Sequence, residues 1–231
     1  MLVSKYFRSC GLAQFPSPFD ALHVDFDKVE EWNKDPTSED KDFREPWMGY
    51  ARSLSCTIGI EATEATYNHY RQFFNGLNRF KKPTSLRLTS VHLLDSRITI
   101  PQVNVQVFTL ENCNVKFGVF AALVKNLPKL THLKLIGVST SEYNPLPCLP
   151  PSSLRKLSVV NPLHWSVDII KMFIPTPWEE VSISWGCGTV HQAFINGVSG
   201  KVTSLDLQGD PSSTYRDASY MGILNIIYHS F

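Results

Sequence analysis

The sequence predicts a mixed α/β fold in which short parallel strands and connecting helices are stacked into a curved solenoid. Two observations carry this prediction. Short segments with alternating apolar residues recur every 22 to 28 residues, and apolar stripes with helical spacing lie between several of them. With 231 residues, of which 43% are hydrophobic, the chain is long enough to stack about seven such units around a shared core.

The clearest unit is the segment 127–138, LPKLTHLKLIGV. Its apolar residues follow the spacing L-x-x-L-x-L-x-x-(N/C): Leu127, Leu130, Leu133, Leu135 and Val138. In a strand, Leu133 and Leu135 point into the core, whereas His132 and Lys134 point to the opposite face. This spacing resembles the leucine-rich repeat. The resemblance implies a parallel sheet on the concave side of the solenoid and helices on the convex side.

Copies of this unit run along the chain. The first apolar residues of the predicted strands are Ile58, Leu86, Phe108, Leu133, Leu157, Val181 and Leu205. The position three residues earlier is also apolar in three copies, at Leu130, Leu154 and Val202, and Cys113 stands where the repeat has Asn or Cys. An earlier alternating strand is expected at Leu22, Val24 and Phe26.

Helices are expected between several strands. The first has its apolar stripe at Tyr70, Phe73, Phe74 and Leu77, and later stripes begin at Phe120, Val167, Val190 and Tyr220. The link from Leu88 to Phe108 is too short and too rich in β-branched residues for a full helix, and the proline-rich segment 141–153 predicts an extended loop. The apolar segment 218–231 predicts either a C-terminally incomplete repeat array or an improvised cap.

The segment before the repeats divides into two parts. Residues 1–26 contain LVSKYFR, a proline-broken link and a strand, and they resemble the last helix of a fungal F-box and its exit into a leucine-rich-repeat domain. Residues 27–49 form an acidic insertion within a stretch, 20–45, that holds ten acidic and four basic residues, and residues 50–231 form the repeat domain. The L-P-x-E-[IL] opening of the F-box is absent. A Skp-type adaptor is therefore expected to bind only if an F-box precedes this sequence.

Composition narrows the classes of function. A net charge of +1 gives no general argument for nucleic acid or membrane binding. Five scattered cysteines without a C-x-x-C pair indicate a reducing compartment, so we expect a cytoplasmic or nuclear protein. The histidines lack metal-ligand spacing, the segment 195–202 meets neither end of the phosphate-loop pattern, and Cys187 in W-G-C-G fits a tight turn. We expect no enzyme, metal or cofactor.

The concave face remains as the candidate site. Residues that alternate with the core residues would align across the repeats, beginning with Thr57, Gly59 and Glu61 on the first strand. The candidates are Arg87, Thr109, Glu111, His132, Lys134, Lys156, Ser158, Ser182 and Asp206. They form either a mildly basic docking strip for an acidic peptide or a simply solvated surface. Binding of a protein partner would serve one of two functions. The chain either recognises the substrate of an F-box ubiquitin ligase or acts as a free-standing repeat protein.

Overall fold

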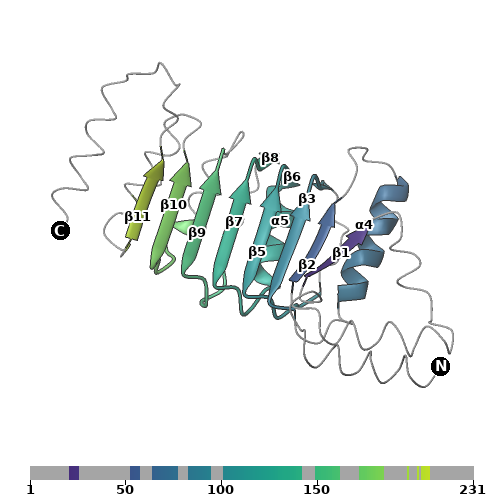
Figure 1. Cartoon of the computed structure of the whole chain (residues 1–231), viewed down its shortest axis with the longest axis horizontal. Helices are drawn as coiled ribbons and strands as arrows, with labels where there is room; N and C mark the ends of the chain where they lie inside the picture. The colour runs from purple at the N-terminus through teal and green to yellow at the C-terminus, as the bar shows by residue number, and fades with distance from the viewer. Residues whose placement is uncertain are drawn as a thin grey trace, which may run out of the picture.

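The computed structural model describes residues 21–25, 53–57, 64–77, 83–94, 101–141, 149–161, 172–184, 197, 202 and 204–208. Side chains are described throughout these ranges except at residues 21–25, 57, 64–69 and 205–208. Eight parallel strands form one sheet, in the order β1-β2-β3-β5-β7-β9-β10-β11 (Figure 1). They are β1 (Ala21–Asp25), β2 (Ser53–Thr57), β3 (Ser85–Thr89), β5 (Val107–Glu111), β7 (His132–Ile136), β9 (Lys156–Val160), β10 (Glu180–Ser184) and β11 (Ser204–Gln208). The prediction of a mixed α/β fold with a parallel sheet is confirmed.

Apolar alternation determines how the strands pair. Neighbouring strands are aligned so that their second residues form one row, which runs Leu22, Leu54, Leu86, Phe108, Leu133, Leu157, Val181 and Leu205. Leu54, Phe108 and Leu133 are fully buried in this row. A shift of one residue in any strand would turn its apolar side chains to the opposite face, so burial fixes the register. The strands predicted at Leu22 and from Leu86 to Leu205 are confirmed.

The strand predicted at Ile58 is wrong. The strand beside β3 is SLSCT, residues 53–57, and its Leu54 rather than Ile58 is the register partner of Leu86. Leu54 and Cys56 are fully buried, and Ile58 itself lies outside the described residues. Leu54 and Ile58 are four positions apart, and a shift by an even number of positions keeps apolar side chains on the same face. Alternation alone therefore does not distinguish the two registers. Cysteine is easily overlooked as a core residue, although it buries as a small hydrophobic side chain.

A second, smaller sheet lies beyond the ends of three large-sheet strands. Its parallel strands are β4 (His92–Leu93), β6 (Asn114–Lys116) and β8 (Ser139–Ser141), in the order β4-β6-β8. Each begins a few residues after a strand of the large sheet, and their backbones continue the same stacking direction (Figure 1). In the described parts of the link from β3 to β5, residues 90–94 and 101–106, there is no helix.

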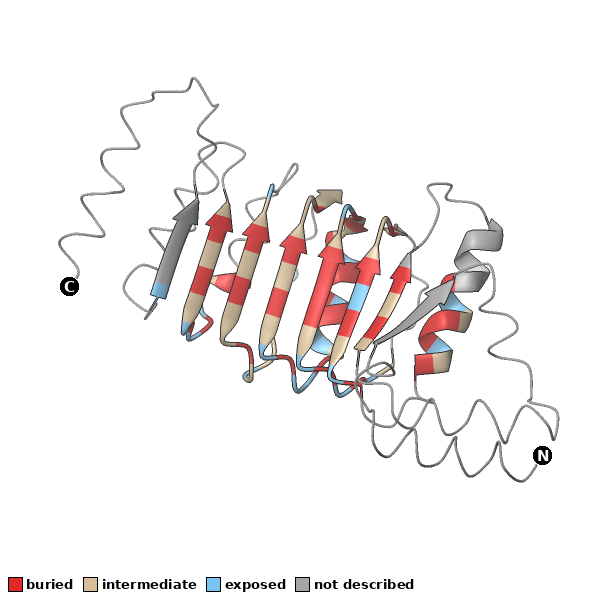
Figure 2. Ribbon diagram, viewed as in Figure 1, coloured by how far each residue is buried: buried red, intermediate tan, exposed pale blue. Residues whose placement is uncertain are grey.

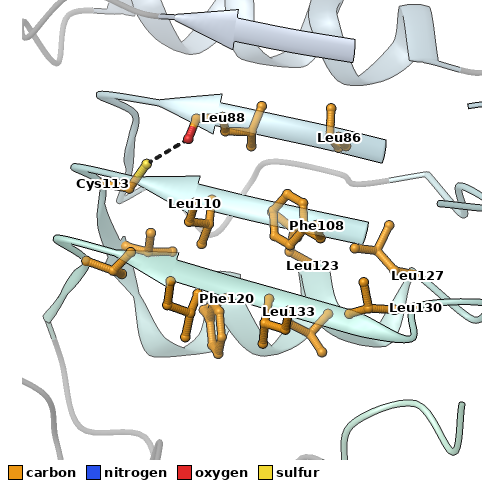
Figure 3. Close-up of a cluster of buried hydrophobic side chains, with 14 of the residues drawn as sticks. Leu86, Leu88, Phe108, Leu110, Cys113, Phe120, Leu123, Leu127, Leu130 and Leu133 are labelled. Atoms are coloured by element: carbon orange, nitrogen blue, oxygen red, sulfur yellow. Dashed lines mark hydrogen bonds between the residues drawn. The ribbon is translucent and has the colours of Figure 1, made fainter. Parts of the chain in front are cut away.

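The two helices whose bounds lie within the described residues are amphipathic. In α4 (Glu64–Gly76), the predicted stripe of Tyr70, Phe73 and Phe74 is buried, and Leu77 directly after the helix is buried with it. The nine-residue α5 (Phe117–Lys125) lies behind the sheet in Figure 1. Its Phe120 and Leu123 extend the cluster of buried side chains formed by Phe108 and Leu133 (Figure 3).

Burial separates the two faces of the large sheet. Along β3, β7, β9 and β10, residues two and four are buried and residues one, three and five are at least partly accessible. The alternating bands in Figure 2 follow this pattern. We call the surface formed by the first, third and fifth residues of the strands the polar face. The predicted F-box-like helix, the acidic insertion and most of the apolar stripes after Val167 lie outside the described residues.

Candidate functional site

The strand register arranges the polar face in three rows. The first row is Ser53, Ser85, Val107, His132, Lys156, Glu180 and Ser204. The middle row is Ser55, Arg87, Thr109, Lys134, Ser158, Ser182 and Asp206, and the third row is Thr57, Thr89, Glu111, Ile136, Val160, Ser184 and Gln208. Neighbours within a row are one strand apart, about 4.8 Å. Side chains far apart in the sequence are therefore close enough to interact directly.

Arg87 is bound to a carboxylate on the same face. Its guanidinium donates two hydrogen bonds to Oε2 of Glu111 on the next strand, one of them from Nε at 2.9 Å. Thr89 Oγ1 donates a weaker bond to the same oxygen at 3.3 Å. The Glu111 side chain is 22% exposed and that of Arg87 is 49% exposed. Because Glu111 neutralises it, Arg87 is less available to a ligand than its charge alone suggests.

Lys156 has the same kind of partner. Its Nζ donates to Oε2 of Glu180 at 2.7 Å, and Glu180 is the register neighbour of Lys156 on β10. The hydrogen bond, reinforced by charge attraction, raises the pKa of Lys156 and lowers that of Glu180. Both side chains are nearly half exposed, so water screens the pair and it contributes little to stability. The Glu180 carboxylate is nevertheless already bound to the Lys156 ammonium group.

His132 lies between these groups. Its Nε2 is 3.0 Å from the hydroxyl oxygen of Ser158, which is on the next strand. Partial burial lowers the pKa of His132, and the charges of Lys134 and Lys156 lower it further, while Glu180 opposes them. The imidazole is therefore neutral near pH 7, because its ordinary pKa is already about 6.5. In this state it accepts the Ser158 proton or donates to Ser158 oxygen, depending on the tautomer.

Lys134 differs from the other two cations. It occupies the middle row of β7 between Thr109 and Ser158, and among the described residues it forms neither an ion pair nor a hydrogen bond through its ammonium group. Among the side chains that the structure describes on the polar face, three are cations, Arg87, Lys134 and Lys156, and two are carboxylates, which bind the first and the third. Of these three cations, Lys134 is the one without a described carboxylate partner.

An apolar pair lies next to this charge. Ile136 and Val160 are register neighbours in the third row, and both are partly accessible. Ile136 follows Lys134 by two residues on the same face of β7, and Val160 has the same relation to Ser158 on β9. The polar face thus combines a lone ammonium group with an accessible aliphatic surface about 7 Å away along the strands.

The sequence-predicted candidates are distributed over all three rows. The register brings Arg87, Thr109, Lys134, Ser158, Ser182 and Asp206 into the middle row, His132 and Lys156 into the first row, and Glu111 into the third. Thr109 is only 7% exposed, so it offers little surface to a partner. Asp206 is placed by its backbone alone. Of the positions predicted for the first strand, Thr57 lies in β2, which also contributes Ser53 and Ser55 to the polar face, whereas Gly59 and Glu61 lie outside the described residues.

Strand alternation also places Glu180, Ile136 and Val160 on this face, but the sequence did not single them out as candidate site residues. A usable pattern was present, because the ion pairs between described residues all join positions 24 apart: Arg87 with Glu111, Arg155 with Glu179 and Lys156 with Glu180. One repeat length corresponds to one step to the neighbouring strand. Opposite charges separated by one repeat therefore predict an ion pair across adjacent strands.

Other site chemistry is limited in the described part of the chain. No group of three or more His, Cys, Asp or Glu side chains there is arranged to hold a metal ion. The Cys113 thiol donates to the carbonyl oxygens of Leu88 and Glu111, and burial raises its pKa to about 11. It is therefore a protonated structural thiol rather than a nucleophile. Cys187 lies outside the described residues.

Comparisons with known proteins add no assignment. No protein-family model matches this sequence, and no curated protein matches it significantly. In the described ranges, the helices are all too short or too polar to cross a bilayer.

Proposed function

We propose that the chain is a leucine-rich-repeat solenoid that binds a protein partner on the polar face of its large sheet. The observation that carries the proposal is the separation of the two faces. One face forms a continuous core with α5, while the other holds a register-aligned array of accessible hydroxyl, charged and aliphatic side chains. Extended arrays of this kind suit the recognition of another protein chain.

Several features of the unit support a leucine-rich repeat. Five strands from β5 to β11 follow one another at spacings of 24 or 25 residues, and buried side chains stand three positions before their first core residues, as in Val105, Leu130, Leu154 and Trp178. Cys113 occupies the position where the repeat has Asn or Cys. Its bonds to backbone carbonyls satisfy groups between successive units, as a buried polar residue there must.

The resemblance of residues 1–26 to the end of an F-box suggests the biological setting. In this proposal, the polar face recognises a substrate, and an F-box would recruit a Skp-type adaptor and so lead to ubiquitin transfer. The alternative is a free-standing repeat protein that binds its partner without a ligase. Both alternatives are binding functions rather than catalytic ones, and both assign the partner to the same face.

Variants of the polar face test the binding function. Affinity purification from cells is performed with the wild-type chain, with a Lys134→Glu/Ser182→Arg double variant, and with Lys129→Glu. Lys129 is exposed on the turn before β7, outside the strand positions that form the polar face, and provides a matched charge change. We expect a discrete partner to be retained by wild type and Lys129→Glu and to be lost from the double variant. Equal recovery with all three proteins would refute the polar face as the binding surface.

A separate pull-down tests the ligase setting. Purified Skp-type adaptor is mixed with the chain as written and with the same chain joined in frame to an upstream F-box. Stable protein interfaces bury on the order of 1,000 Å² or more, which a single short helix does not supply. We expect adaptor binding only with the fusion. Micromolar or tighter binding by the chain as written would show that its own residues suffice. Adaptor binding by neither protein would favour the free-standing alternative.

A further inference from the structure

The positive charge of the polar face is available at one position. Lys156 has its own carboxylate at 2.7 Å, and Arg87 is bound by Glu111. A ligand anion at either position would compete with a partner that is already in place. At Lys134 it would meet an ammonium group with no carboxylate partner among the described residues, so a negative group is most stable there.

The neighbours of Lys134 complete an anion-binding set. Ser158 is its register partner on β9, and the Ser158 hydroxyl is hydrogen-bonded to His132 Nε2. A carboxylate above Lys134 accepts from the ammonium group and, after rotation of the hydroxyl, from Ser158. Ser158 oxygen then accepts from protonated His132. Partial burial is the main reason why the pKa of His132 is lowered, and the charges of Lys134 and Lys156 add to it. The bound anion offsets these two lysine charges and so favours the protonated imidazole.

The two flanking carboxylates restrict the position of an acidic ligand group. Displacement toward β10 brings it toward Glu180, and displacement toward the third row of β5 brings it toward Glu111. The third row of β7 and β9 instead presents Ile136 and Val160. Extended peptides and strands share a two-residue repeat of about 6.7 Å, so a ligand side chain two positions from the acid reaches this apolar pair.

We propose that the polar face over β7 and β9 binds an extended protein segment in which an acidic and an apolar side chain stand two residues apart. The acid lies on Lys134 and Ser158, and the apolar side chain lies on Ile136 and Val160. This inference rests on the proposed function and specifies the chemistry of its partner. It also makes binding dependent on pH, because the acid favours protonated His132 and binding takes up a proton.

Selection from a displayed library of random nine-residue peptides tests the proposal. The target is the full 231-residue chain. Lys134→Gln and Lys129→Gln serve as paired targets that lose the same charge on and off the face. We expect wild type and Lys129→Gln to enrich peptides in which Asp or Glu stands two residues from Leu, Ile, Val or Phe. Lys134→Gln should lose this enrichment. Enrichment without an acid, or equal enrichment on Lys134→Gln, would overturn the proposal.

Anisotropy measurements on an enriched, labelled peptide give three further readouts. Replacing its acid by the amide should weaken binding about five- to tenfold on wild type and have little effect on Lys134→Gln, because about 1 kcal/mol of charge-assisted bonding is lost. The Ile136→Ser variant should bind this peptide more weakly than wild type, because it removes part of the aliphatic surface on which the peptide's apolar side chain lies. Lowering the pH from 7.5 to 6 should strengthen binding to wild type but not to His132→Gln. Binding that weakens in wild type as the pH falls would contradict the His132 coupling.

Failure of this inference can be distinguished from failure of the proposed function. Selected peptides that lack the acid–apolar pattern but are lost on Lys134→Glu/Ser182→Arg would retain the polar face as a binding surface and reject the acidic occupant. Peptides that bind all variants equally would reject both. A labelled single-stranded oligonucleotide is measured in parallel, and tighter, Lys134-dependent binding of it would overturn the assignment to a protein segment.

Discussion

Four residues that directly follow strands of the large sheet have positive φ angles: Ser90 at 57°, Asn112 at 51°, Gly137 at 58° and Asn161 at 47°. The amides of the first three donate to the last carbonyl of the next strand, at Glu111, Ile136 and Val160, with distances of 2.7 to 2.8 Å. The left-handed conformation turns the chain and positions this amide for its neighbour. Asparagine and glycine tolerate that conformation better than most residues, which accounts for three of the four positions.

Replacing Gly137 by alanine should be destabilising for two separable reasons. An alanine at φ 58° costs about 1 to 2 kcal/mol. In addition, a Cβ at this position would lie 2.5 Å from Oδ1 of Asn112 in the preceding turn. We expect Gly137→Ala to lower the free energy of unfolding by about 2 kcal/mol or more, measured by urea denaturation.

The Asn112→Gly background separates the two contributions. It removes the Oδ1 contact while keeping a residue that accepts positive φ, and alone it should cost about 1 kcal/mol or less. Gly137→Ala should then cost less in this background than in wild type, which gives a measurable coupling energy in a double-mutant cycle. Equal costs in both backgrounds would show that backbone conformation alone determines the effect.

His132 should make the stability of the protein dependent on pH. Partial burial and the two lysines lower its pKa in the folded state below the unfolded value of about 6.5. The unfolded chain therefore binds more protons in this window, and stability rises with pH. We expect the contribution to be complete above about pH 6.5 and to be lost as the pH falls through the folded-state pKa.

Denaturation midpoints measured between pH 5 and 7.5 test this expectation. His132→Gln keeps a polar side chain near Ser158 and removes the titration. It should flatten the pH dependence relative to wild type. A variant with an unchanged slope would exclude His132 as its source. The groups near the imidazole that influence it are Lys134, Lys156 and Glu180, while its register neighbour on β5 is the uncharged Val107.

At the scale of the element, β7 shows how one strand performs two tasks. Leu133 is fully buried and Leu135 is 1% exposed, while Lys134 between them lies on the polar face. Leu133→Ala should reduce the free energy of unfolding by about 2 to 5 kcal/mol because it leaves a cavity among packed side chains. Lys134→Ala, in the same strand, should change it by less than about 0.5 kcal/mol.

Chemical denaturation of the two variants tests this division. Peptide binding should respond in the opposite order, with Lys134→Ala losing affinity and Leu133→Ala retaining it under conditions where the protein is folded. Comparable destabilisation by both substitutions would mean that Lys134 is packed into the structure rather than available to a ligand.

The elements differ in how well the sequence predicted them. Strands with large apolar residues at two alternating core positions, such as Leu133 and Leu135, were placed correctly because burial fixes their register. The strand containing Leu54 was misplaced by four residues because a second alternating segment at Ile58 follows it. The short strands β4, β6 and β8 were missed because two or three residues are too few to show a period.

The candidate site was predicted at the level of the face but not of its pairing. Strand alternation indicated that Arg87, Lys134 and Lys156 share a surface, and the register places them there. Their different availability depends on Glu111 and Glu180, which are within reach only because successive strands are stacked in register. Alternation within one strand carries no information on contacts between strands. The 24-residue separation of the paired charges does carry it, because it equals one repeat.

At the scale of the whole molecule, each strand of the large sheet pairs only with the strands on either side of it. The row of buried second residues, which includes Leu54 and Leu133, is likewise built from neighbour-to-neighbour contacts. Destabilisation in such an arrangement spreads outward from the altered unit and weakens with distance. The polar face is formed by the same strands, so a substitution should disturb it most near the altered strand. Binding over β7 and β9 should therefore depend most on the strands immediately beside them.

The same substitution at two positions tests this neighbour-by-neighbour coupling. Leu54 and Leu133 are both fully buried, but Leu54 lies in β2, next to the outer described strand β1, and Leu133 lies in the central strand β7. Leu54→Ala should accelerate amide hydrogen exchange in β2 and β3 while leaving residues 180–184 of β10 close to their wild-type rates. Leu133→Ala should accelerate exchange on both sides, in β5 and in β9 and β10, because β5 and β9 both pair with β7 and β10 pairs with β9. Mass-spectrometric exchange resolves these segments. Uniform acceleration throughout the sheet by Leu54→Ala would instead show that the eight strands unfold as one cooperative unit.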